Sequence, residues 1–233
     1  MGSHALKSLL LFVLLTAPLT RAQQGSVVGE VQLSVIGPDG KPQPKADRSG
    51  VVVYLTGYTE PPPAEVAKMG QVKKTFTPAV LPIVAGQKVE FDNQDVVVHN
   101  VFSRSVARKF DAGKNRPGEK YVETFKKTGI VDVYCDIHEQ MVATVVVVPN
   151  RAFAVTDKNG RFELKGVPPG RHPIFAVHRR DEKSDIARGE VVVEAGRATP
   201  LNTLRLTETR ADDSHLDKHG KKYGPRHDYS GKE

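Results

Sequence analysis

The chain has 233 residues, of which 39% are hydrophobic, with 34 Lys and Arg against 27 Asp and Glu for a formal net charge of +7. This length and composition are typical of a soluble protein with one large core or two small ones. The positive excess is modest, and aromatic residues are not interleaved with a basic recognition motif, so nucleic-acid binding is not expected.

The first 22 residues have the pattern of a secretory signal. Lys7 precedes an apolar run from Leu9 to Leu15, and small residues lead to a cleavage point after Ala22. The run is too short for a membrane span, which needs about 20 apolar residues, so no membrane anchor is expected. We therefore predict a signal peptide at residues 1–22 and an exported protein, periplasmic or extracellular.

After the signal, short Val-rich stretches recur between clusters of Gly, Pro, Asn and Asp, which predicts an all-β fold. Strands are expected at residues 26–36, 51–56, 96–102, 130–134, 145–148, 174–178, 191–194 and 201–206, with a hairpin over residues 154–164.

Cys135 is the single cysteine, so it has no disulfide partner within its own chain in an oxidising compartment. Alone, it would as readily be an inert core residue. It ends an alternating strand, however, and His138 and Met141 follow at three-residue intervals. A second expected strand, residues 96–102, carries His99. Together these residues offer two imidazoles, one thiolate and one thioether.

This donor set is typical of a blue-copper site, in which two His and one Cys form a trigonal plane with a weak axial Met. The sulfur donors favour Cu(I) and the imidazoles accommodate Cu(II), so we predict one copper ion that cycles between these states. Zinc is the alternative, although Met141 is an unfavourable fourth ligand for it.

The same residues resemble the cupredoxins, and in particular the short-loop form of amicyanins and methylamine-utilization cupredoxins. The resemblance covers about Thr75 to Pro149, including Val89 to Asn93, the His99-Asn100 pair and the Cys135 to Met141 loop. It implies a Greek-key β-sandwich with His99, Cys135 and His138 as equatorial ligands and Met141 as the axial one. It also implies that Asn100 ties the two ligand loops together, where a simple turn is the alternative. A c-type cytochrome or a dehydrogenase would be the redox partner.

The remaining sequence resembles the carboxypeptidase regulatory-like (transthyretin-like) β-sandwich. It carries a Gly40-Lys41-Pro42 turn, a Thr156-Asp157-x-x-Gly160-x-Phe162 pattern and a Val167-Pro168-Pro169-Gly170 step. We predict that residues 26–58 and 151–208 form this small sandwich and that a copper domain at residues 59–150 interrupts it. In the alternative, the domains stand in tandem and strand 51–56 belongs to the copper domain.

Residues 209–233 are charged and poor in aliphatic side chains, so a disordered tail is expected, with His215, His219 and His227 scattered along it. No second histidine-rich centre of the kind that copper enzymes need is visible, and no enzymatic activity is expected. The predicted function is one-electron transport by a mononuclear copper protein. Copper binding, delivery or storage without a redox role is the alternative.

Overall fold

The computed structural model describes residues 23–179, 187–209 and 215–223, so the signal predicted at residues 1–22 lies outside the described residues. Every regular element in the described ranges is a β-strand, and the predicted all-β class is confirmed. No helix in these ranges is long and apolar enough to cross a membrane.

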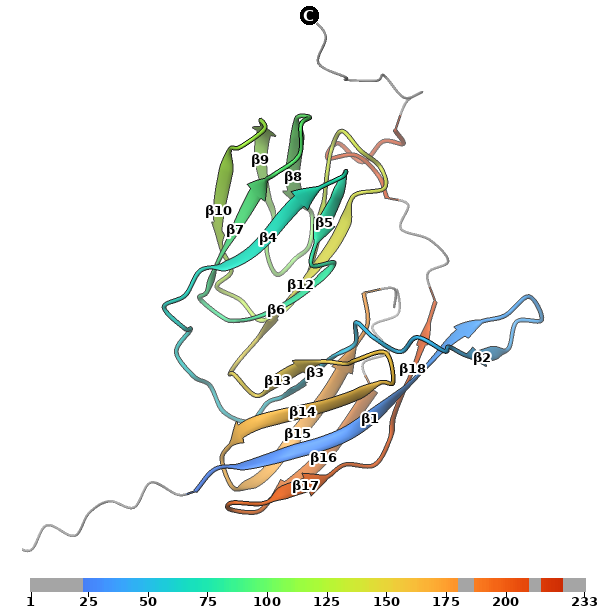
Figure 1. Cartoon of the computed structure of the whole chain (residues 1–233), viewed down its shortest axis with the longest axis vertical. Helices are drawn as coiled ribbons and strands as arrows, with labels where there is room; N and C mark the ends of the chain where they lie inside the picture. The colour runs from blue at the N-terminus through green and yellow to red at the C-terminus, as the bar shows by residue number, and fades with distance from the viewer. Residues whose placement is uncertain (1–22, 180–186, 210–214, 224–233) are drawn as a thin grey trace, which may run out of the picture.

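The middle of the chain forms a two-sheet unit, here called the central domain, which occupies the upper half of Figure 1. Its strands are β4 (Ala67–Val72), β5 (Thr75–Thr77), β6 (Val80–Val84), β7 (Lys88–Asn93), β8 (His99–Ser103), β9 (Phe110–Asn115), β10 (Lys120–Thr124), β11 (Gly129–Tyr134) and β12 (Val142–Val148). One sheet has the order β10-β7-β4-β5 and the other β6-β12-β11-β8-β9. Phe91, Phe125 and Val145 belong to the buried cluster that fills the space between them.

The segments on either side of the central domain pair with each other and form the flanking domain. Its strands are β1 (Gly25–Ile36), β2 (Pro42–Pro44), β3 (Val52–Leu55), β13 (Phe153–Val155), β14 (Arg161–Val167), β15 (Gly170–Val177), β16 (Ala187–Val193), β17 (Ala198–Pro200) and β18 (Leu204–Glu208). β1 pairs with β2, β14, β17 and β18, whereas β3 lies between β13 and β15 in the second sheet. Val31, Val53 and Leu164 contribute to the core between these sheets.

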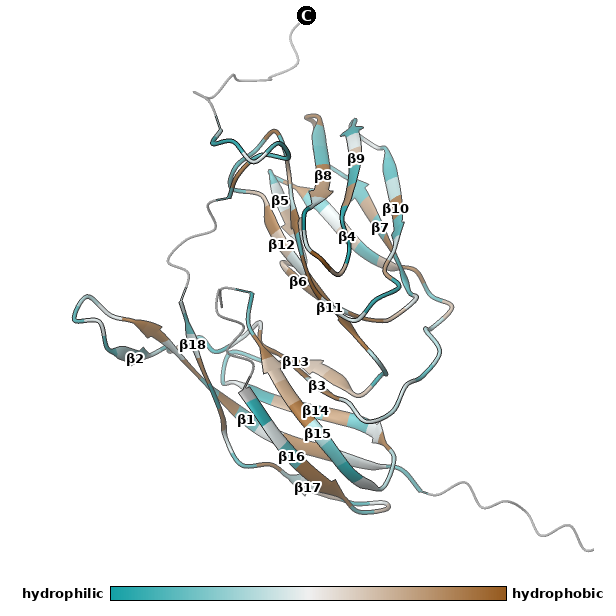
Figure 2. Cartoon of the chain, turned by 180° about the vertical axis from the view of Figure 1, so that it is seen from behind, coloured by the Kyte–Doolittle hydropathy of each residue, from teal (hydrophilic) through white to brown (hydrophobic). Residues whose placement is uncertain are grey.

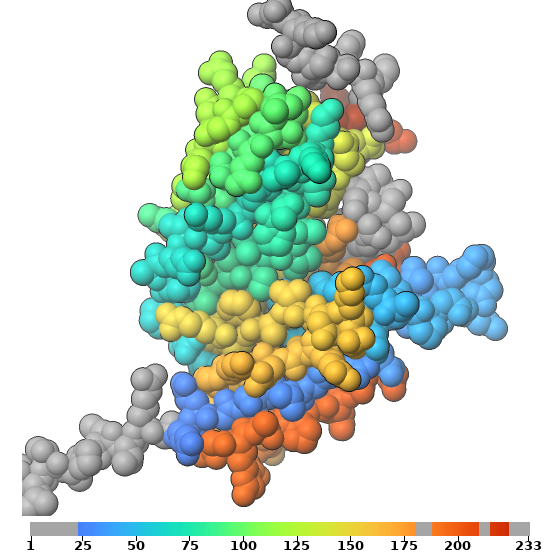
Figure 3. Space-filling view, in the orientation of Figure 1, coloured from blue at the N-terminus to red at the C-terminus, as the bar shows by residue number. Residues whose placement is uncertain are grey.

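The two domains are joined by a third apolar cluster. In β3, Val53 points into the flanking core and Val52 points the opposite way, because successive side chains of a strand face opposite sides. In β12, Val145 packs in the central core while Val146 and Val148 pack against Val52. Both strands are thus buried on both faces, as their continuous Val runs indicate (Figure 2). The domains therefore stack directly on each other (Figure 3).

The strand predicted at residues 96–102 begins later than expected. β8 starts at His99, and Val96 is 88% exposed in the preceding loop. The cause is Asn93, whose side-chain amide donates to the Val97 carbonyl while its oxygen accepts the Asp95 N–H. These local bonds outweigh the strand propensity of three successive valines.

The hairpin predicted over residues 154–164 is also different. β13 pairs with β3 in one sheet, and β14 pairs with β1 in the other, so the turn between them crosses from sheet to sheet. The turn is closed by Asp157, whose carboxylate accepts the N–H groups of Asn159 and Arg161. The sequence indicated the turn at Asp157 correctly. It did not indicate that the strands on either side of the turn belong to different sheets, which pack on a shared core.

Candidate metal centre

Two loops bring the predicted ligands to the end of the central domain that is remote from the flanking domain (Figure 1). His99 begins β8, Cys135 directly follows β11, and His138 lies in the loop from β11 to β12. Met141 immediately precedes β12. The antiparallel pairing of β11 with β12 holds the ends of this loop together, because Tyr134 is opposite Val142.

The donor atoms of His99, Cys135 and His138 converge on one point. The two histidine Nδ1 atoms are 3.1 Å apart, and the Cys135 Sγ lies 4.0 Å from Nδ1 of His99 and 3.7 Å from Nδ1 of His138. Among the His, Cys, Asp and Glu side chains of the described ranges, these three converge closely enough to hold a metal ion. Both imidazoles thus turn the same ring nitrogen toward the thiol.

The group is enclosed by the core, with one ligand reaching the surface. His99, Cys135 and Met141 are fully buried, whereas His138 is partly exposed. Met141 packs in the same apolar cluster as Cys135, its N–H donates to the His138 carbonyl, and its own carbonyl accepts the Cys135 N–H. The short loop therefore fixes the Met next to the other three residues.

Burial favours the uncharged forms of all three titrating donors. It raises the pKa of the Cys135 thiol, and it lowers the pKa of His99 despite the attraction of the Asp95 carboxylate. Burial, reinforced by the neighbouring His99 ring, lowers the pKa of His138 to about 4. At neutral pH the two imidazoles are consequently available as neutral donors.

Asn100 links the two ligand loops. Its backbone N–H points at the Cys135 Sγ at 3.5 Å, and its side-chain oxygen accepts the Asp136 N–H. Its amide nitrogen donates to the Asp111 carboxylate and to the Gly113 carbonyl. Its backbone N–H and side-chain amide therefore connect the Cys135 loop to β8 and β9.

Asp95 is a site residue that the sequence analysis missed. Its Oδ2 lies 3.2 Å from His99 Nε2, on the side of the ring opposite the metal-facing Nδ1. The same oxygen accepts the Lys74 N–H at 2.7 Å, in a turn where Lys73 and Lys74 both have positive φ. A carboxylate in this position fixes the imidazole orientation and tautomer. Asp95 lies four residues before His99, but nothing in the sequence shows that the loop bends back.

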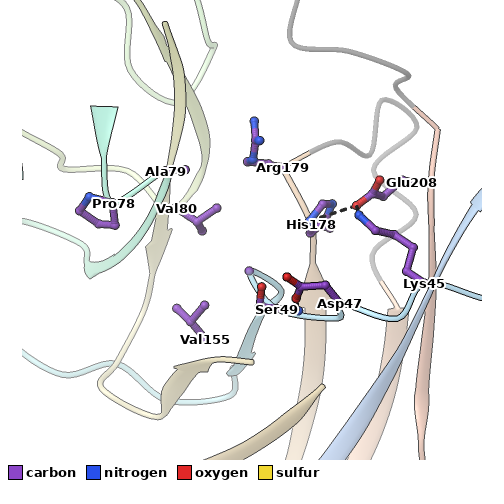
Figure 4. A pocket seen from close by; sticks show the side chains of 11 residues that line it. Lys45, Asp47, Ser49, Pro78, Ala79, Val80, Val155, His178, Arg179 and Glu208 are labelled. Carbon is purple, nitrogen blue, oxygen red and sulfur yellow. Dashed lines mark hydrogen bonds and ion pairs between the residues drawn. The ribbon is translucent and has the colours of Figure 1, made fainter. Parts of the chain in front are cut away.

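The other buried histidines of the described ranges belong to the flanking domain. His172 bonds to the Pro168 carbonyl, and His178 lies 3.6 Å from the buried Glu208 carboxylate, which also pairs with Lys45. His178, Lys45 and Glu208 line one side of a pocket of about 410 Å³, and Val80 of the central domain lines the opposite side (Figure 4). This pocket is separate from the ligand cluster.

Comparison with known proteins agrees with this geometry. Residues 64–148 match the family described as copper binding proteins, plastocyanin/azurin family. These residues form a cupredoxin domain. No curated protein matches the chain.

Solved structures similar to the cupredoxin domain include a purple cupredoxin from Nitrosopumilus maritimus, with 26% identity over 35% of this chain and 99% of that chain (TM-score 0.33). Amicyanin from Paracoccus versutus is 26% identical over 41% of this chain and 97% of its own (TM-score 0.34). A copper-containing nitrite reductase from Thermus scotoductus is 30% identical over 40% of this chain but only 24% of its own length (TM-score 0.35).

The donor set of the cupredoxin domain fits a copper ion. A thiolate, a thioether and two imidazoles combine soft and intermediate donors, and both sulfur-bearing residues lie in an apolar cluster. Carboxylates do not enter the cluster, since Asp95 faces the far side of the His99 ring. Hard cations such as Mg²⁺ or Ca²⁺ prefer all-oxygen sites, so this arrangement disfavours them.

Proposed function

We propose that this chain is an exported type 1 (blue) copper protein that carries single electrons between redox partners. The observation that carries the proposal is the convergence of His99 Nδ1, His138 Nδ1 and Cys135 Sγ beside the buried Met141. Bound copper would supply the one-electron couple between Cu(I) and Cu(II). Cys135, His99, His138 and Met141 would hold the ion, with Met141 as the weakest donor.

The protein's own contribution is to keep the donors in place through both oxidation states. Asn100 fixes the Cys135 loop, and Asp95 fixes the His99 ring. Because these partners are themselves hydrogen-bonded, small rearrangements are expected on electron exchange. Cys135 has to lose its proton for metal to bind, since the thiolate is the ligand.

His138 is the proposed route for electrons because it is partly exposed while the other ligand residues are fully buried. Two apolar residues that follow His138 in the chain offer little surface, since Met141 is fully buried and Val142 is 8% exposed. Ile137, which precedes His138, is partly exposed, and Val96 in the loop before His99 is 88% exposed. Weak redox encounters use small contact areas, below about 1,200 Å² in total.

The Cys-x2-His-x2-Met spacing supports assignment to the short-loop, amicyanin-like type. The flanking domain, with two packed sheets and the Gly40 and Gly160 turns, supports a carboxypeptidase regulatory-like sandwich. We further propose that the protein has no enzymatic activity of its own and that a c-type cytochrome or a dehydrogenase exchanges electrons with it.

The test is the visible spectrum and redox behaviour of the protein loaded with Cu(II). An intense thiolate-to-copper charge-transfer band and reversible one-electron reduction are expected. A colourless Cu(II) complex would remove the type 1 assignment. A coloured protein that surrenders Cu(I) to a chelator on each reduction would favour copper delivery or storage. Preference for Zn²⁺ over copper in a competition assay would favour a zinc site.

A further inference from the structure

Residues 215–223 lie against the ligand loop of the cupredoxin domain, where the red segment in Figure 1 meets the loop between β11 and β12. The sequence predicts a disordered tail at these residues, and the structure departs from that prediction. We call these nine residues the C-terminal clamp. Charged composition gave no sign of it, because its contacts are with residues more than 80 positions earlier.

The clamp has a defined turn of its own. Asp217 donates its N–H to the Lys221 carbonyl, and its carboxylate accepts the N–H groups of His219 and Lys221. Asx turns of this kind are local and independent of the rest of the fold. The turn presents Lys218 to the cupredoxin domain, with His215 on one side of it and Tyr223 on the other.

The first connection runs from the clamp to the backbone of the Cys ligand. The Tyr223 hydroxyl donates to the Cys135 carbonyl at 2.6 Å, and His215 Nε2 lies 2.9 Å from the same hydroxyl. The His215 ring stacks on Tyr134 with centroids 4.3 Å apart. Two aromatic side chains of the clamp thus hold the peptide that precedes and includes Cys135.

The second connection reaches the Cys sulfur through Asn100. The Lys218 N–H donates to the Asp136 carboxylate at 2.9 Å, and its ammonium group lies 3.0 Å from Asp111 Oδ2. The other oxygen of Asp111 accepts the side-chain amide of Asn100, whose backbone N–H points at Cys135 Sγ. An unbroken series of polar contacts therefore joins Lys218 to the sulfur.

From these two connections we propose that Lys218 and Tyr223 are positioning residues of the metal centre, which set the placement of the Cys135 thiolate from outside the cupredoxin domain. The proposal rests on the copper-binding function proposed above. The hydrogen bond from the Asn100 N–H, which Lys218 helps to place through Asp111, reduces the donation of the thiolate to the metal and therefore favours Cu(I). The positive charge of Lys218 acts in the same direction, because it disfavours the higher metal charge.

The test uses three single variants of the full chain, Lys218→Met, Tyr223→Phe and, as the matched control, Lys222→Met. Lys222 is exposed on the same segment and carries the same charge. We expect Lys218→Met to lower the reduction potential and Tyr223→Phe to shift the charge-transfer band. Tyr223→Phe should also weaken Cu(II) binding about tenfold, the lower end of the usual effect of residues that support metal ligands. Lys222→Met should match the wild type in all three measurements.

Amide hydrogen exchange of residues 134–141 in the metal-free protein gives a readout that needs no copper. Exchange should be faster in Lys218→Met and Tyr223→Phe than in the wild type or Lys222→Met. If exchange is faster in these two variants but no blue band forms in the wild type or any variant, the clamp does hold the ligand loop, and the proposed copper function is wrong. If the wild type is blue while exchange, potential and band are the same in all variants, the clamp proposal is overturned. Equal changes in Lys218→Met and Lys222→Met would also overturn it, because general charge would then explain them.

Discussion

The Nδ1 atoms of His99 and His138 lie 3.1 Å apart although 39 positions separate the two residues in the chain. The rings meet edge to face, with centroids 4.9 Å apart. Without a metal ion between them, protonation of both rings would place two positive charges side by side, with Lys74 adding a third nearby. The site is therefore built for neutral imidazoles.

The metal-free protein should lose stability on mild acidification. The pKa of His138 is about 4 in the folded protein against 6.5 for an unperturbed histidine, so between these values the unfolded chain binds more protons. The free energy of unfolding should be fully retained above pH 6.5 and fall as the pH drops toward 4. Asp95, beside His99, partly opposes this effect. Urea unfolding at pH 7 and pH 5 measures this loss of unfolding free energy. His138→Asn should show a smaller difference in unfolding free energy between the two pH values.

Replacing Cys135 with Ser should abolish the visible charge-transfer band of the copper-loaded protein while the fold is kept. The hydroxyl is smaller and polar but can accept the Asn100 N–H that faces the sulfur. The cost in unfolding free energy is expected to be about 1 kcal/mol. Absorption spectra and thermal unfolding of the metal-free variant check both parts. Retention of the band would exclude Cys135 as the ligand.

Replacing Met141 with Leu should leave the protein coloured and raise its reduction potential. Loss of a weak sulfur donor destabilises Cu(II) more than Cu(I), while the similar volume of Leu keeps the fully buried position filled. The loss of unfolding free energy should stay below about 1.5 kcal/mol. Cyclic voltammetry measures the potential. A lower potential in the variant would mean that Met141 is not the axial ligand.

Asp95→Asn should weaken Cu(II) binding about tenfold and raise the reduction potential, because a carboxylate at His99 Nε2 makes the imidazole a stronger donor. Asp92→Asn is the control, since Asp92 is three residues earlier and its carboxylate instead contacts Gln94 and Lys120. Copper titration and voltammetry of both variants show whether the change depends on the contact with His99 or only on the loss of a nearby carboxylate. If they behave alike, the contact with His99 has no special effect.

A fragment of residues 59–150 should fold and bind copper, with a charge-transfer band shifted from that of the full chain because the fragment lacks the C-terminal clamp. Its ligands and core strands are all within the cupredoxin domain, and β3 pairs with β13 and β15 instead. The fragment exposes Val146 and Val148, which the flanking domain covers, so it should be less soluble. An unfolded fragment, with residues 26–150 folded, would instead support tandem domains that share strand 51–56.

The sequence by itself determined the strand-rich class and the local part of the site. Alternation of apolar residues leads into a short loop, and within that loop the spacing of Cys135, His138 and Met141 is enough to place three donors on one turn. The double burial of β3 and β12 likewise follows from uninterrupted valines, because both faces of each strand must be apolar.

Only the tertiary structure decided which distant residues meet. The loop before His99 leaves the strand because Asn93 satisfies its backbone groups, and this brings Asp95 behind the imidazole. The Thr156–Gly160 turn joins two sheets because β13 pairs with β3 and β14 pairs with β1. Lys218 and Tyr223 reach the Cys135 loop across 82 and 88 positions. Contacts of this kind leave no periodic pattern, because they depend on how separate surfaces pack and not on the spacing of neighbours along the chain.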